Sequence, residues 1–514
     1  MMYYARHKVQ DTTALYTLCH ILFFVSFIII TLLLQISLSA CKKDSAQSDN
    51  FTPDGQRYNN LISDRWFGIY FKGNKLGFTN SMVYEGEDGY KIVSKAIIKM
   101  KVYGEVQETS FSQECYLTKD LKAKGFNSLH QIAVHRQSIS GFVKGDKLYM
   151  KITSAGAVSK TTIDFDRDTY LSGAIDLIIK KNGISVGKKY NLKILMEPIQ
   201  TILLIQIEIK RKEKVIIDGL EKEAFYLEER YKGLTAGMWV TEDGEILKEV
   251  SLEGLESRRE DRDTALRFDK DVIPMSSLIT FSLIKPDKTI KEPHQVKRLR
   301  LKLKNISKPD IIIEDRRQRV LSKNQVGKVY EVEMEVRLES QKSEARSKKL
   351  EGNISFDKYL EETPEIQSNN SEIKMKASEI VGGESDLWLK VLKINKWVFD
   401  YLEKKPVDTF SAVDALKSRE GECQSHSNLF AALSRASGIP TKIVSGIVYS
   451  QDYNGFLYHA WPEVFIGEWI PLDPTLGEEE VDATHVKLVE GSWEEQLKLL
   501  YFIGKVGIEI IKIG

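Results

Sequence analysis

The chain has 514 residues, of which 42% are hydrophobic and 29% charged, a composition typical of folded proteins rather than of disordered or polytopic membrane chains. Because single hydrophobic cores stop growing at about 250 to 300 residues, this length predicts two or three domains. The 74 basic and 73 acidic residues nearly cancel. No long-range positive field is then available to gather a phosphate backbone, so nucleic acid is not an expected partner.

The amino terminus has the pattern of an export signal. Arg6 and Lys8 precede a strongly apolar run at residues 21–34. The run leads into Leu38-Ser39-Ala40-Cys41, which resembles the lipobox of bacterial lipoproteins, where cleavage leaves the cysteine as a lipid-modified first residue. This resemblance implies a lipoprotein-type signal peptide at 1–40 and a membrane anchor on Cys41, facing the periplasm or cell exterior. An uncleaved signal anchor is the alternative.

Cysteine usage is sparse, with four residues in all, of which Cys19 and Cys41 belong to the export segment. The remaining two, Cys115 and Cys423, make no disulfide framework. A single bridge between them is conceivable in an oxidising compartment, but we expect both thiols to be free.

The region after a polar tether at 41–60 alternates apolar and polar residues in short runs, from Trp66 to about Leu252. Three dipeptides suit tight hairpin turns: Asp88-Gly89, Gly145-Asp146 and Asp243-Gly244. The pattern predicts an antiparallel β-rich domain at 61–268, built as one large curved or barrel-like sheet. His130 and His135 lack a set of metal-ligand partners there, so we expect packed or surface roles for them.

Composition changes divide the rest of the chain. A charged stretch at 256–267 and a stretch rich in Pro and Lys at 285–298 mark a boundary. They predict a smaller β-rich segment at 269–340, a polar linker at 341–370 and a carboxy-terminal domain at 371–514.

The carboxy-terminal domain reads as mixed α+β. Apolar spacing predicts an amphipathic helix within residues 380–402 and a second helix after Cys423, which Gly438-Ile439-Pro440 would end. The strands expected beyond it are residues 441–449, 459–466 and 469–472. The fold class predicted for the whole chain is therefore multidomain, with antiparallel β-rich domains followed by an α+β domain.

Several motifs in this domain occur together and in order. They are Asp414-Ala415-Leu416, Gly421-Glu422-Cys423-Gln424, residues 435–440, His459-Ala460-Trp461 and the stretch from Trp469 to Asp473-Pro474-Thr475. The set resembles bacterial transglutaminase-like domains over residues 378–477. The resemblance implies a papain-like arrangement in which Cys423 begins a helix and His459 and Asp473 lie on adjacent strands.

The chemistry of these residue types agrees with that arrangement. A helix amino terminus offers unpaired N–H groups and a partial positive charge, which can lower a thiol pKa from about 8.5 to between roughly 3.5 and 7.5. Gly421 permits a tight turn before the helix, and the backbone N–H of Cys423 can help to bind an oxyanion. His459 would serve as general base and acid, and Asp473 would hold its tautomer.

Register decides whether the histidine and the aspartate can meet. They flank a hairpin around Ile466 and Gly467. A loop centred on Ile466 places them directly opposite, whereas a two-residue loop at Gly467-Glu468 places them on opposite faces. The triad therefore predicts a loop of odd length or a bulge, either of which Gly467 makes feasible.

Other groups near the motifs have more ordinary interpretations. His426 is the nearest competitor for the base, but a supporting or surface role is favoured, and Trp461 and Trp469 either line the site or pack in the core. Cys423, His426 and His459 lack the paired short spacings of zinc sites, so neither a metal nor a cofactor is expected.

The function predicted from the sequence is cysteine-dependent acyl transfer on peptide or protein amide bonds. Hydrolysis by a protease or amidase is slightly favoured over transamidation, because water is always present. The alternative is an inactive lipoprotein scaffold that binds peptide or cell-envelope material. Thiolate reactivity at Cys423 discriminates the two, since a scaffold has no need for it.

Overall fold

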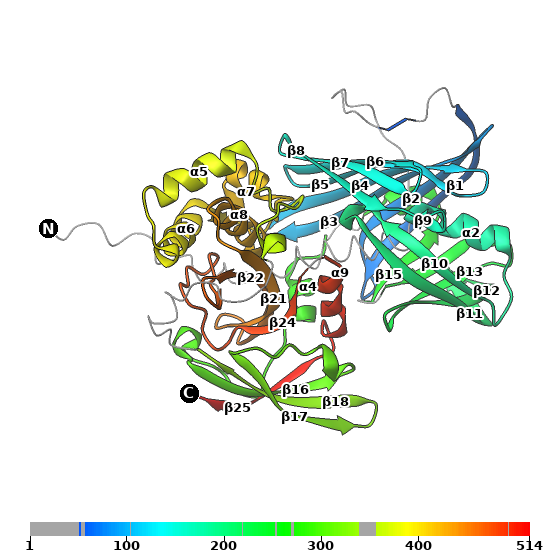
Figure 1. Cartoon of the computed structure of the whole chain (residues 1–514). Coiled ribbons are helices and arrows are strands. Elements are labelled where there is room, and N and C mark those ends of the chain that lie inside the picture. The colour runs from blue at the N-terminus through cyan, green and yellow to red at the C-terminus, as the bar shows by residue number, and fades with distance from the viewer. Residues whose placement is uncertain are drawn as a thin grey trace. The chain divides into compact units, whose positions relative to one another are not determined.

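The structure is a computed structural model that describes residues 51–52, 57–102, 104–217, 219–251, 254–268, 272–338, 356–491 and 493–514. The chain divides into an amino-terminal unit that ends at Met275 and a carboxy-terminal unit, Ser276–Gly514 (Figure 1). The predicted signal peptide at 1–40, its Cys41, most of the tether and half of the predicted linker lie outside the described residues. Among the helices that are described, none is both long and apolar enough to cross a membrane.

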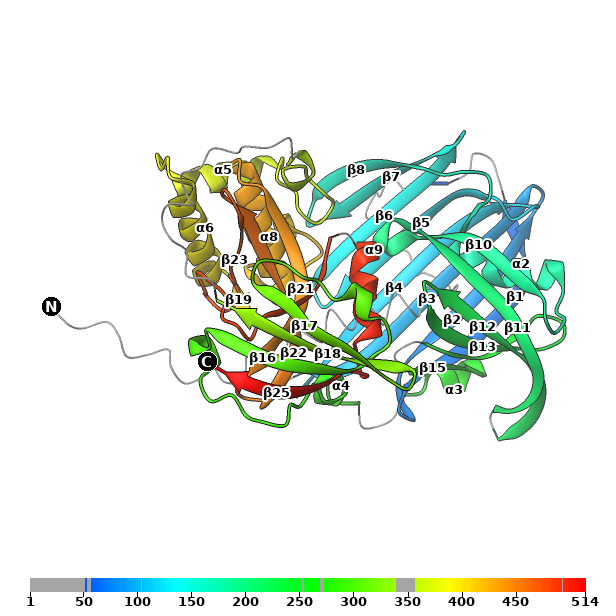
Figure 2. The ribbon, with the colours of Figure 1, turned by 60° about the horizontal axis from the view of Figure 1, so that its bottom comes forward.

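The amino-terminal unit is built on one largely antiparallel sheet of 15 strands (Figures 1 and 2). Its strands are β1 Tyr58–Phe71, β2 Asn74–Gly86, β3 Gly89–Val102, β4 Glu105–Thr118, β5 Ala123–Ile132, β6 His135–Lys144, β7 Lys147–Ser154, β8 Ala157–Asp164, β9 Thr169–Leu171, β10 Lys189–Met196, β11 Thr201–Ile217, β12 Leu220–Tyr231, β13 Leu234–Val240, β14 Ile246–Val250 and β15 Leu255–Glu260. Strands that follow one another in sequence are neighbours in the sheet, except that β8 and β9 form its two ends, and β1 pairs with β15. The pairing is antiparallel throughout, apart from the parallel pair of β9 and β10. The predicted antiparallel β-rich class is confirmed.

Local sequence explains this meander. In β7, side chains of alternating burial follow the period of two that a half-buried strand requires. The Gly145-Asp146 loop joins β6 to β7, and Asp243-Gly244 lies in the turn before β14, as predicted. The turn before β3 is shifted by one residue, because Gly86 pairs with Gly89 and the loop is Glu87-Asp88. A Cβ atom on Gly89 would lie 1.8 Å from the Leu117 carbonyl oxygen, so a glycine is needed inside the strand.

Two short helices accompany this sheet, α2 Ile175–Asn182 and α3 Arg262–Leu266. Asp176 of α2 forms an ion pair with buried Arg65, at 2.9 Å between Oδ2 and Nη2. Buried Glu229 lies close enough to Asp176 for the aspartate charge, after burial itself, to raise its pKa to about 8. The unit therefore encloses ionisable groups as well as an apolar core.

The carboxy-terminal unit contains two four-stranded sheets and a two-stranded one. The first has the order β17-β18-β16-β25, the second β23-β22-β21-β24, and the third pairs β19 with β20. The bounds are β16 Arg298–Ile306, β17 Gln318–Val326, β18 Val329–Arg337, β19 Glu403–Lys404, β20 Glu420–Gly421, β21 Thr441–Ser450, β22 Gly455–Phe465, β23 Trp469–Pro471, β24 Val486–Glu490 and β25 Gly507–Ile513. The strands at 298–337 thus share a sheet with the last strand of the chain.

Helices pack around α8, which spans Cys423–Ala436 and is buried along nearly its whole length. The other described α-helices of this unit are α4 Ser276–Ser282, α5 Ser371–Val381, α6 Leu387–Tyr401, α7 Ala412–Ser418 and α9 Trp493–Gln496. Helices α5, α6 and α7 contact α8 on one side, and β21 and β22 contact it on the other. The predicted helix after Cys423 is confirmed, with Gly438 in the left-handed region at φ +79° just beyond its end.

The helix predicted within 380–402 begins later than expected. Gly382 has φ +56° and follows the end of α5. Asp386 then caps α6, with its carboxylate accepting a hydrogen bond from the Leu389 N–H at 2.9 Å. Two helices therefore replace the start of the single predicted one.

Candidate active site

Cys423 is the first residue of α8, and its side chain is 1% exposed. The preceding turn is held by the Glu422 N–H, which donates to the Val407 carbonyl at 3.1 Å. Because the first N–H groups of a helix lack intrahelical acceptors and carry the positive end of the dipole, this is a favourable place for a thiolate. Cys423 and Cys115 are both free thiols in the structure.

Gly421 makes the close turn before this helix possible. Its φ is +150°, and a Cβ atom there would lie 2.4 Å from Ser425 Oγ. That hydroxyl accepts a hydrogen bond from the Thr409 N–H at 2.9 Å and donates to Asp408. The glycine therefore lets the chain pass against a hydrogen-bonded serine at the foot of α8.

His459 lies on β22, which packs against α8, and it is directly opposite Gly446 of β21. Ser427, one helical turn after Cys423, donates from Oγ to the Ala460 carbonyl at 3.2 Å. Cys423 packs directly against Ala460. These contacts bring the first turn of α8 to the segment of β22 that carries the histidine.

The β22–β23 hairpin has the odd loop that a triad requires. Phe465 pairs with Trp469, so the loop consists of three residues centred on Gly467, which has φ +96°. The loop is therefore centred one residue after Ile466, the centre that would place the histidine and the aspartate directly opposite. His459 and Asp473 nevertheless share a face, as residues on a diagonal, and His459 Nε2 lies 2.6 Å from Asp473 Oδ2.

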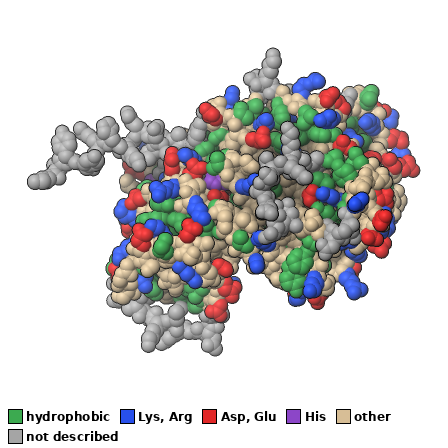
Figure 3. Space-filling model, turned by 90° about the horizontal axis from the view of Figure 1, so that it is seen from above, with side chains coloured by type: hydrophobic (Ala, Val, Ile, Leu, Met, Phe, Trp, Pro, Cys, Tyr) green, Lys and Arg blue, Asp and Glu red, His purple; other side chains and the backbone are tan. Residues whose placement is uncertain are grey.

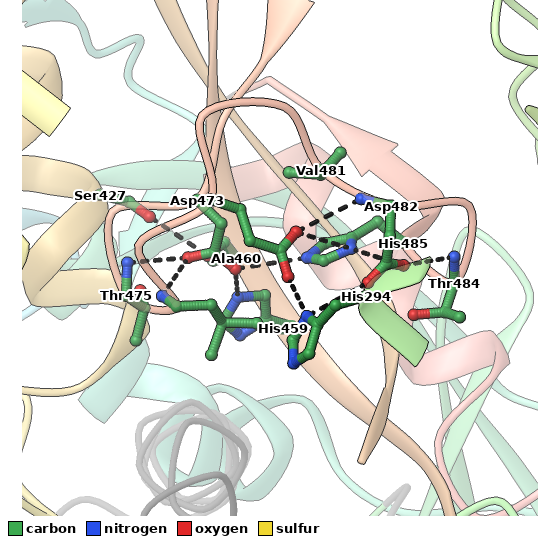
Figure 4. Close-up of polar contacts among 12 residues, drawn as sticks. His294, Ser427, His459, Ala460, Asp473, Thr475, Val481, Asp482, Thr484 and His485 are labelled. Carbon is green, nitrogen blue, oxygen red and sulfur yellow. Dashed lines mark hydrogen bonds and ion pairs between the residues drawn. The ribbon is translucent and has the colours of Figure 1, made fainter. Parts of the chain in front are cut away.

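Asp473 is fully buried and is surrounded by donors (Figure 4). Its Oδ1 accepts hydrogen bonds from the N–H groups of Thr475 and Leu476, at 2.8 and 3.0 Å. Its Oδ2 contacts His459 and also His485, whose Nε2 is 3.3 Å away. Burial alone would raise the pKa of this carboxyl, but the charges and hydrogen bonds of the two histidines hold it well below its usual range.

The imidazole of His459 connects the carboxylate to the thiol. Burial alone would lower its pKa, but the charge and hydrogen bond of Asp473, and then the hydrogen bond and charge of Cys423, raise the pKa to about 10. Since Nε2 faces Asp473, Nδ1 is the nitrogen left for the sulfur. The structure thus brings Cys423, His459 and Asp473 into one continuous chain of contacts, in an order suited to an ion pair of thiolate and imidazolium.

His485 is a further member of this group that the sequence analysis missed. It is fully buried, its pKa is raised to about 9 by neighbouring carboxylates against the effect of burial, and it shares Asp473 with His459. Trp461 is fully buried and packs against both histidines, with its ring centroid 6.1 Å from that of His459 and 5.2 Å from that of His485. The signal available in the sequence was only that few histidines occur after Cys423.

The other residues considered from the sequence are not part of this chain of contacts. His426 is fully buried rather than at the surface, with Nδ1 2.8 Å from the Glu422 carbonyl oxygen, and burial lowers its pKa to about 4. Trp469 packs with Phe465 and Tyr359. His130 contacts Phe111 and His135 is buried, which agrees with packed roles.

A helix that begins at a cysteine, packed on an antiparallel sheet that presents a histidine and an aspartate, defines the papain-like class of folds. Residues 374–474 match the transglutaminase-like superfamily. This part of the chain is therefore a transglutaminase-like domain, and the resemblance seen in the sequence is confirmed. No curated protein matches the chain.

Three solved structures show limited likeness to parts of the chain. A protein of Cytophaga hutchinsonii provisionally assigned as a cysteine protease has 17% identity and a TM-score of 0.28, covering 41% of this chain and 82% of its own. A β-barrel-like domain of unknown function from Brucella abortus has 7% identity and a TM-score of 0.30, covering 38% and 95%. A Parabacteroides distasonis protein provisionally assigned as a protease has 12% identity and a TM-score of 0.18, covering 68% and 69%. At these TM-scores the likenesses carry no conclusion.

Proposed function

We propose that the carboxy-terminal unit catalyses acyl transfer from amide bonds of a peptide or protein, through a thioester on Cys423. The observation that carries this proposal is the contact chain from the thiol to His459 and on to Asp473, with 2.6 Å between His459 Nε2 and Asp473 Oδ2. Each member has an ordinary alternative when taken alone. Together, in a transglutaminase-like domain and at a helix start, they match the requirements of an activated cysteine nucleophile.

In the acylation step, the Cys423 thiolate attacks the amide carbonyl carbon and forms a tetrahedral oxyanion. The backbone N–H of Cys423, at the start of α8, is one donor for that oxygen. As the C–N bond breaks, the imidazolium of His459 gives its proton to the leaving amine, leaving a thioester and a neutral imidazole. Asp473 keeps the imidazole oriented and stabilises its charged form.

In the deacylation step, His459 removes a proton from the acceptor as the acceptor attacks the thioester. Water gives a carboxylic acid and restores the thiolate and imidazolium, whereas a primary amine gives a new amide. We favour hydrolysis slightly, because water needs no binding site of its own. No metal ion or cofactor enters either step.

The competing proposal is a scaffold that has the fold but does not react. Cys423 is 1% exposed, which suits a packed core cysteine as well as a nucleophile at the end of a narrow approach. The reactivity of the thiol separates the two, because a core cysteine behaves like any other buried thiol. Cys115 supplies the comparison within the same chain, since it is fully buried and burial is the main reason that its pKa lies well above the usual range.

The test is the rate of iodoacetamide alkylation at each cysteine as a function of pH, measured by peptide mass spectrometry on the folded chain. We expect Cys423 to react well below pH 8 while Cys115 stays unreactive, and His459→Ala to remove this advantage. Peptide amides then serve as trial substrates, with mass spectrometry of a trapped thioester as readout. If Cys423 is as inert as Cys115 while the protein is folded, the scaffold proposal replaces the enzyme.

Figure 3 shows basic and acidic side chains interspersed over the face that it displays, which agrees with a peptide or protein partner and offers no basic surface there for nucleic acid.

We further propose that Cys41 anchors the protein in a membrane, with the domains facing the periplasm or the cell exterior. In a bacterial host, the wild-type chain should incorporate a radiolabelled fatty acid and sediment with membranes, and Cys41→Ser should do neither. Label on the Cys41→Ser chain would contradict lipidation at this residue.

A further inference from the structure

A second cluster of metal-ligand side chains lies beside the triad, on the far side of His485 (Figure 4). It consists of His294, Glu478 and Asp482. His294 comes from the short helical turn Pro293–Gln295 before β16, and the two acidic residues come from the loop between β23 and β24. One nitrogen or oxygen atom from each of the three lies within 4.8 Å of the others.

One carboxylate oxygen of Asp482 is buried without a hydrogen bond among the described residues. The residue is 3% exposed, and its Oδ1 accepts a hydrogen bond from the Thr484 N–H at 2.6 Å. Its Oδ2 is buried and has no hydrogen-bond partner among the described residues, and lies 3.6 Å from His294 Nδ1. A buried carboxylate oxygen without a hydrogen bond is costly unless a cation satisfies it, and either a bound metal ion or a protonated His294 can supply that charge.

The donor set suits a transition metal. An imidazole nitrogen with two carboxylate oxygens is a frequent ligand set for Zn²⁺ and similar divalent ions, with bonds of about 2.0 to 2.2 Å. Ligand atoms around a tetrahedral ion with such bonds lie about 3.4 Å apart, close to the 3.6 Å between His294 Nδ1 and Asp482 Oδ2. His294 Nδ1 and Glu478 Oε1, which are 2.5 Å apart, would have to separate by about 1 Å.

We propose that His294 Nδ1, Glu478 Oε1 and Asp482 Oδ2 bind a divalent transition-metal ion of the Zn²⁺ type, with water completing the coordination. The His294 side chain is 48% exposed, so the ion can enter from solvent and the imidazole has room to adjust. Glu478 and Asp482, by contrast, are 13% and 4% exposed in their side chains and are held in place. The sequence analysis expected no metal: Glu478 and Asp482 are only four residues apart, but nothing in the sequence brings the distant His294 to them.

The ion would join two segments that are distant in sequence. Glu478 forms an antiparallel bridge with Asp473, in which each N–H donates to the other carbonyl, at 2.9 and 3.0 Å. The ion therefore ties the turn at His294 to the loop that begins at the aspartate of the triad. It should stabilise this loop by mass action, by about 2.7 kcal/mol when free metal is 100 times its dissociation constant. This site does not depend on whether Cys423 is catalytic.

The test uses the full chain without a histidine tag, in a Cys423→Ala background. This background matters because the group His459, Asp473 and His485 is also close enough to hold an ion, and a thiolate would add to it. Zn²⁺ binding is measured by equilibrium dialysis with elemental analysis, and Co²⁺ is used as a spectroscopic probe of nitrogen and oxygen ligands. The variants are His294→Ala and Asp482→Asn, with His459→Ala as the matched control.

We expect one Zn²⁺ per chain in the background protein, at least about 100-fold weaker binding in His294→Ala and in Asp482→Asn, and unchanged binding in His459→Ala. Thermal unfolding in EDTA establishes that each variant is folded. Two results overturn the proposal. In the first, the folded background protein does not bind Zn²⁺, which leaves a salt bridge with protonated His294 as the whole account of the cluster. In the second, His459→Ala loses the ion while His294→Ala keeps it, which assigns the ion to the triad.

Discussion

Asp473 shows how single residues govern the proposed reaction. Its two carboxylate oxygens contact two backbone N–H groups and two histidines, although the side chain is fully buried. A buried carboxylate with this many donors stays ionised, and its charge sustains the imidazolium form of His459. The same carboxylate therefore controls both the tautomer and the charge of the proposed base.

Asp473→Asn should remove that control. Burial lowers the pKa of His459, and in the wild type the aspartate charge reverses the effect and raises the pKa to about 10. With Asn the imidazolium is lost near neutral pH, so alkylation of Cys423 at pH 6 should fall at least about 100-fold. The alkylation rate of Cys423 is measured by quenching the reaction at set times and quantifying the modified peptide by mass spectrometry. Asp414→Asn is the matched control, because Asp414 is also buried but its carboxylate accepts a hydrogen bond from the Phe410 N–H at the start of α7. The alkylation rate of Asp414→Asn should stay within about twofold of the wild-type rate.

His485 should act as a positioning residue for Asp473. His485→Phe removes the donor that lies 3.3 Å from Asp473 Oδ2, and we expect Cys423 alkylation at pH 6 to slow by roughly 10- to 100-fold, as for a group misplaced by about 1 Å. His485→Gln can return an amide donor to the position of Nε2, and it should recover most of the rate. Equal losses in the Phe and Gln variants, with both folded, would assign His485 a packing role only.

At the scale of elements, the start of α8 depends on one glycine. Gly421→Ala places a Cβ atom 2.4 Å from Ser425 Oγ at a φ of +150°, so either the serine or the turn must shift. We expect a loss of about 1 to 3 kcal/mol in the free energy of unfolding and slower alkylation of Cys423, because the first N–H groups of the helix move. Calorimetry and the alkylation assay measure the two effects.

Gly383→Ala is the control for this substitution. Gly383 lies between α5 and α6, its φ is outside the left-handed region, and an added Cβ atom meets nothing within 4 Å. Stability and reactivity should therefore stay at wild-type values. A destabilisation of Gly383→Ala as large as that of Gly421→Ala would mean that the clash with Ser425 is not the cause.

At the scale of the whole molecule, the amino-terminal unit should lose stability in alkali. Burial raises the pKa of Glu197 to about 7, and burial with the charge of Asp176 raises that of Glu229 to about 8. A glutamate whose pKa is higher in the folded than in the unfolded chain makes its full contribution to the stability of the folded state below about pH 4.5. That contribution is lost as pH rises through 7 and 8, because ionisation is easier in the unfolded chain.

Glu229→Gln should therefore raise the unfolding temperature of this unit by several degrees at pH 9 and change it little at pH 5. Gly421 lies in the carboxy-terminal unit, so the calorimetric transition of the amino-terminal unit is the one whose temperature Gly421→Ala does not change. Glu223→Gln is the control, because Glu223 is exposed on the neighbouring part of the same strand, where it pairs with Lys212. It should leave the unfolding temperature nearly unchanged at both pH values, because exposed ion pairs contribute little. A stabilisation by Glu229→Gln that is equal at both pH values would exclude ionisation as its cause.

The sequence by itself determined the features that short-range patterns encode. Alternation and turn residues indicated the antiparallel sheet, and the ordered motifs around Cys423, His459 and Asp473 indicated the domain that residues 374–474 form. Parity alone showed that the β22–β23 loop had to be odd, because side chains alternate between faces with a period of two. Gly382 and Asp386 were local signals for the break between α5 and α6 that a search for apolar spacing passed over.

Only the tertiary structure decided what depends on contacts between distant segments. The pairing of β25 with β16, the placement of His485 against Asp473, and the approach of His294 to Glu478 join residues whose separation leaves no periodic trace. The loop centre at Gly467 rather than Ile466 likewise became known only from the register of β22 and β23. Local propensity acts over a few residues, whereas these contacts are selected by burial in the folded core, where most polar groups must find a partner.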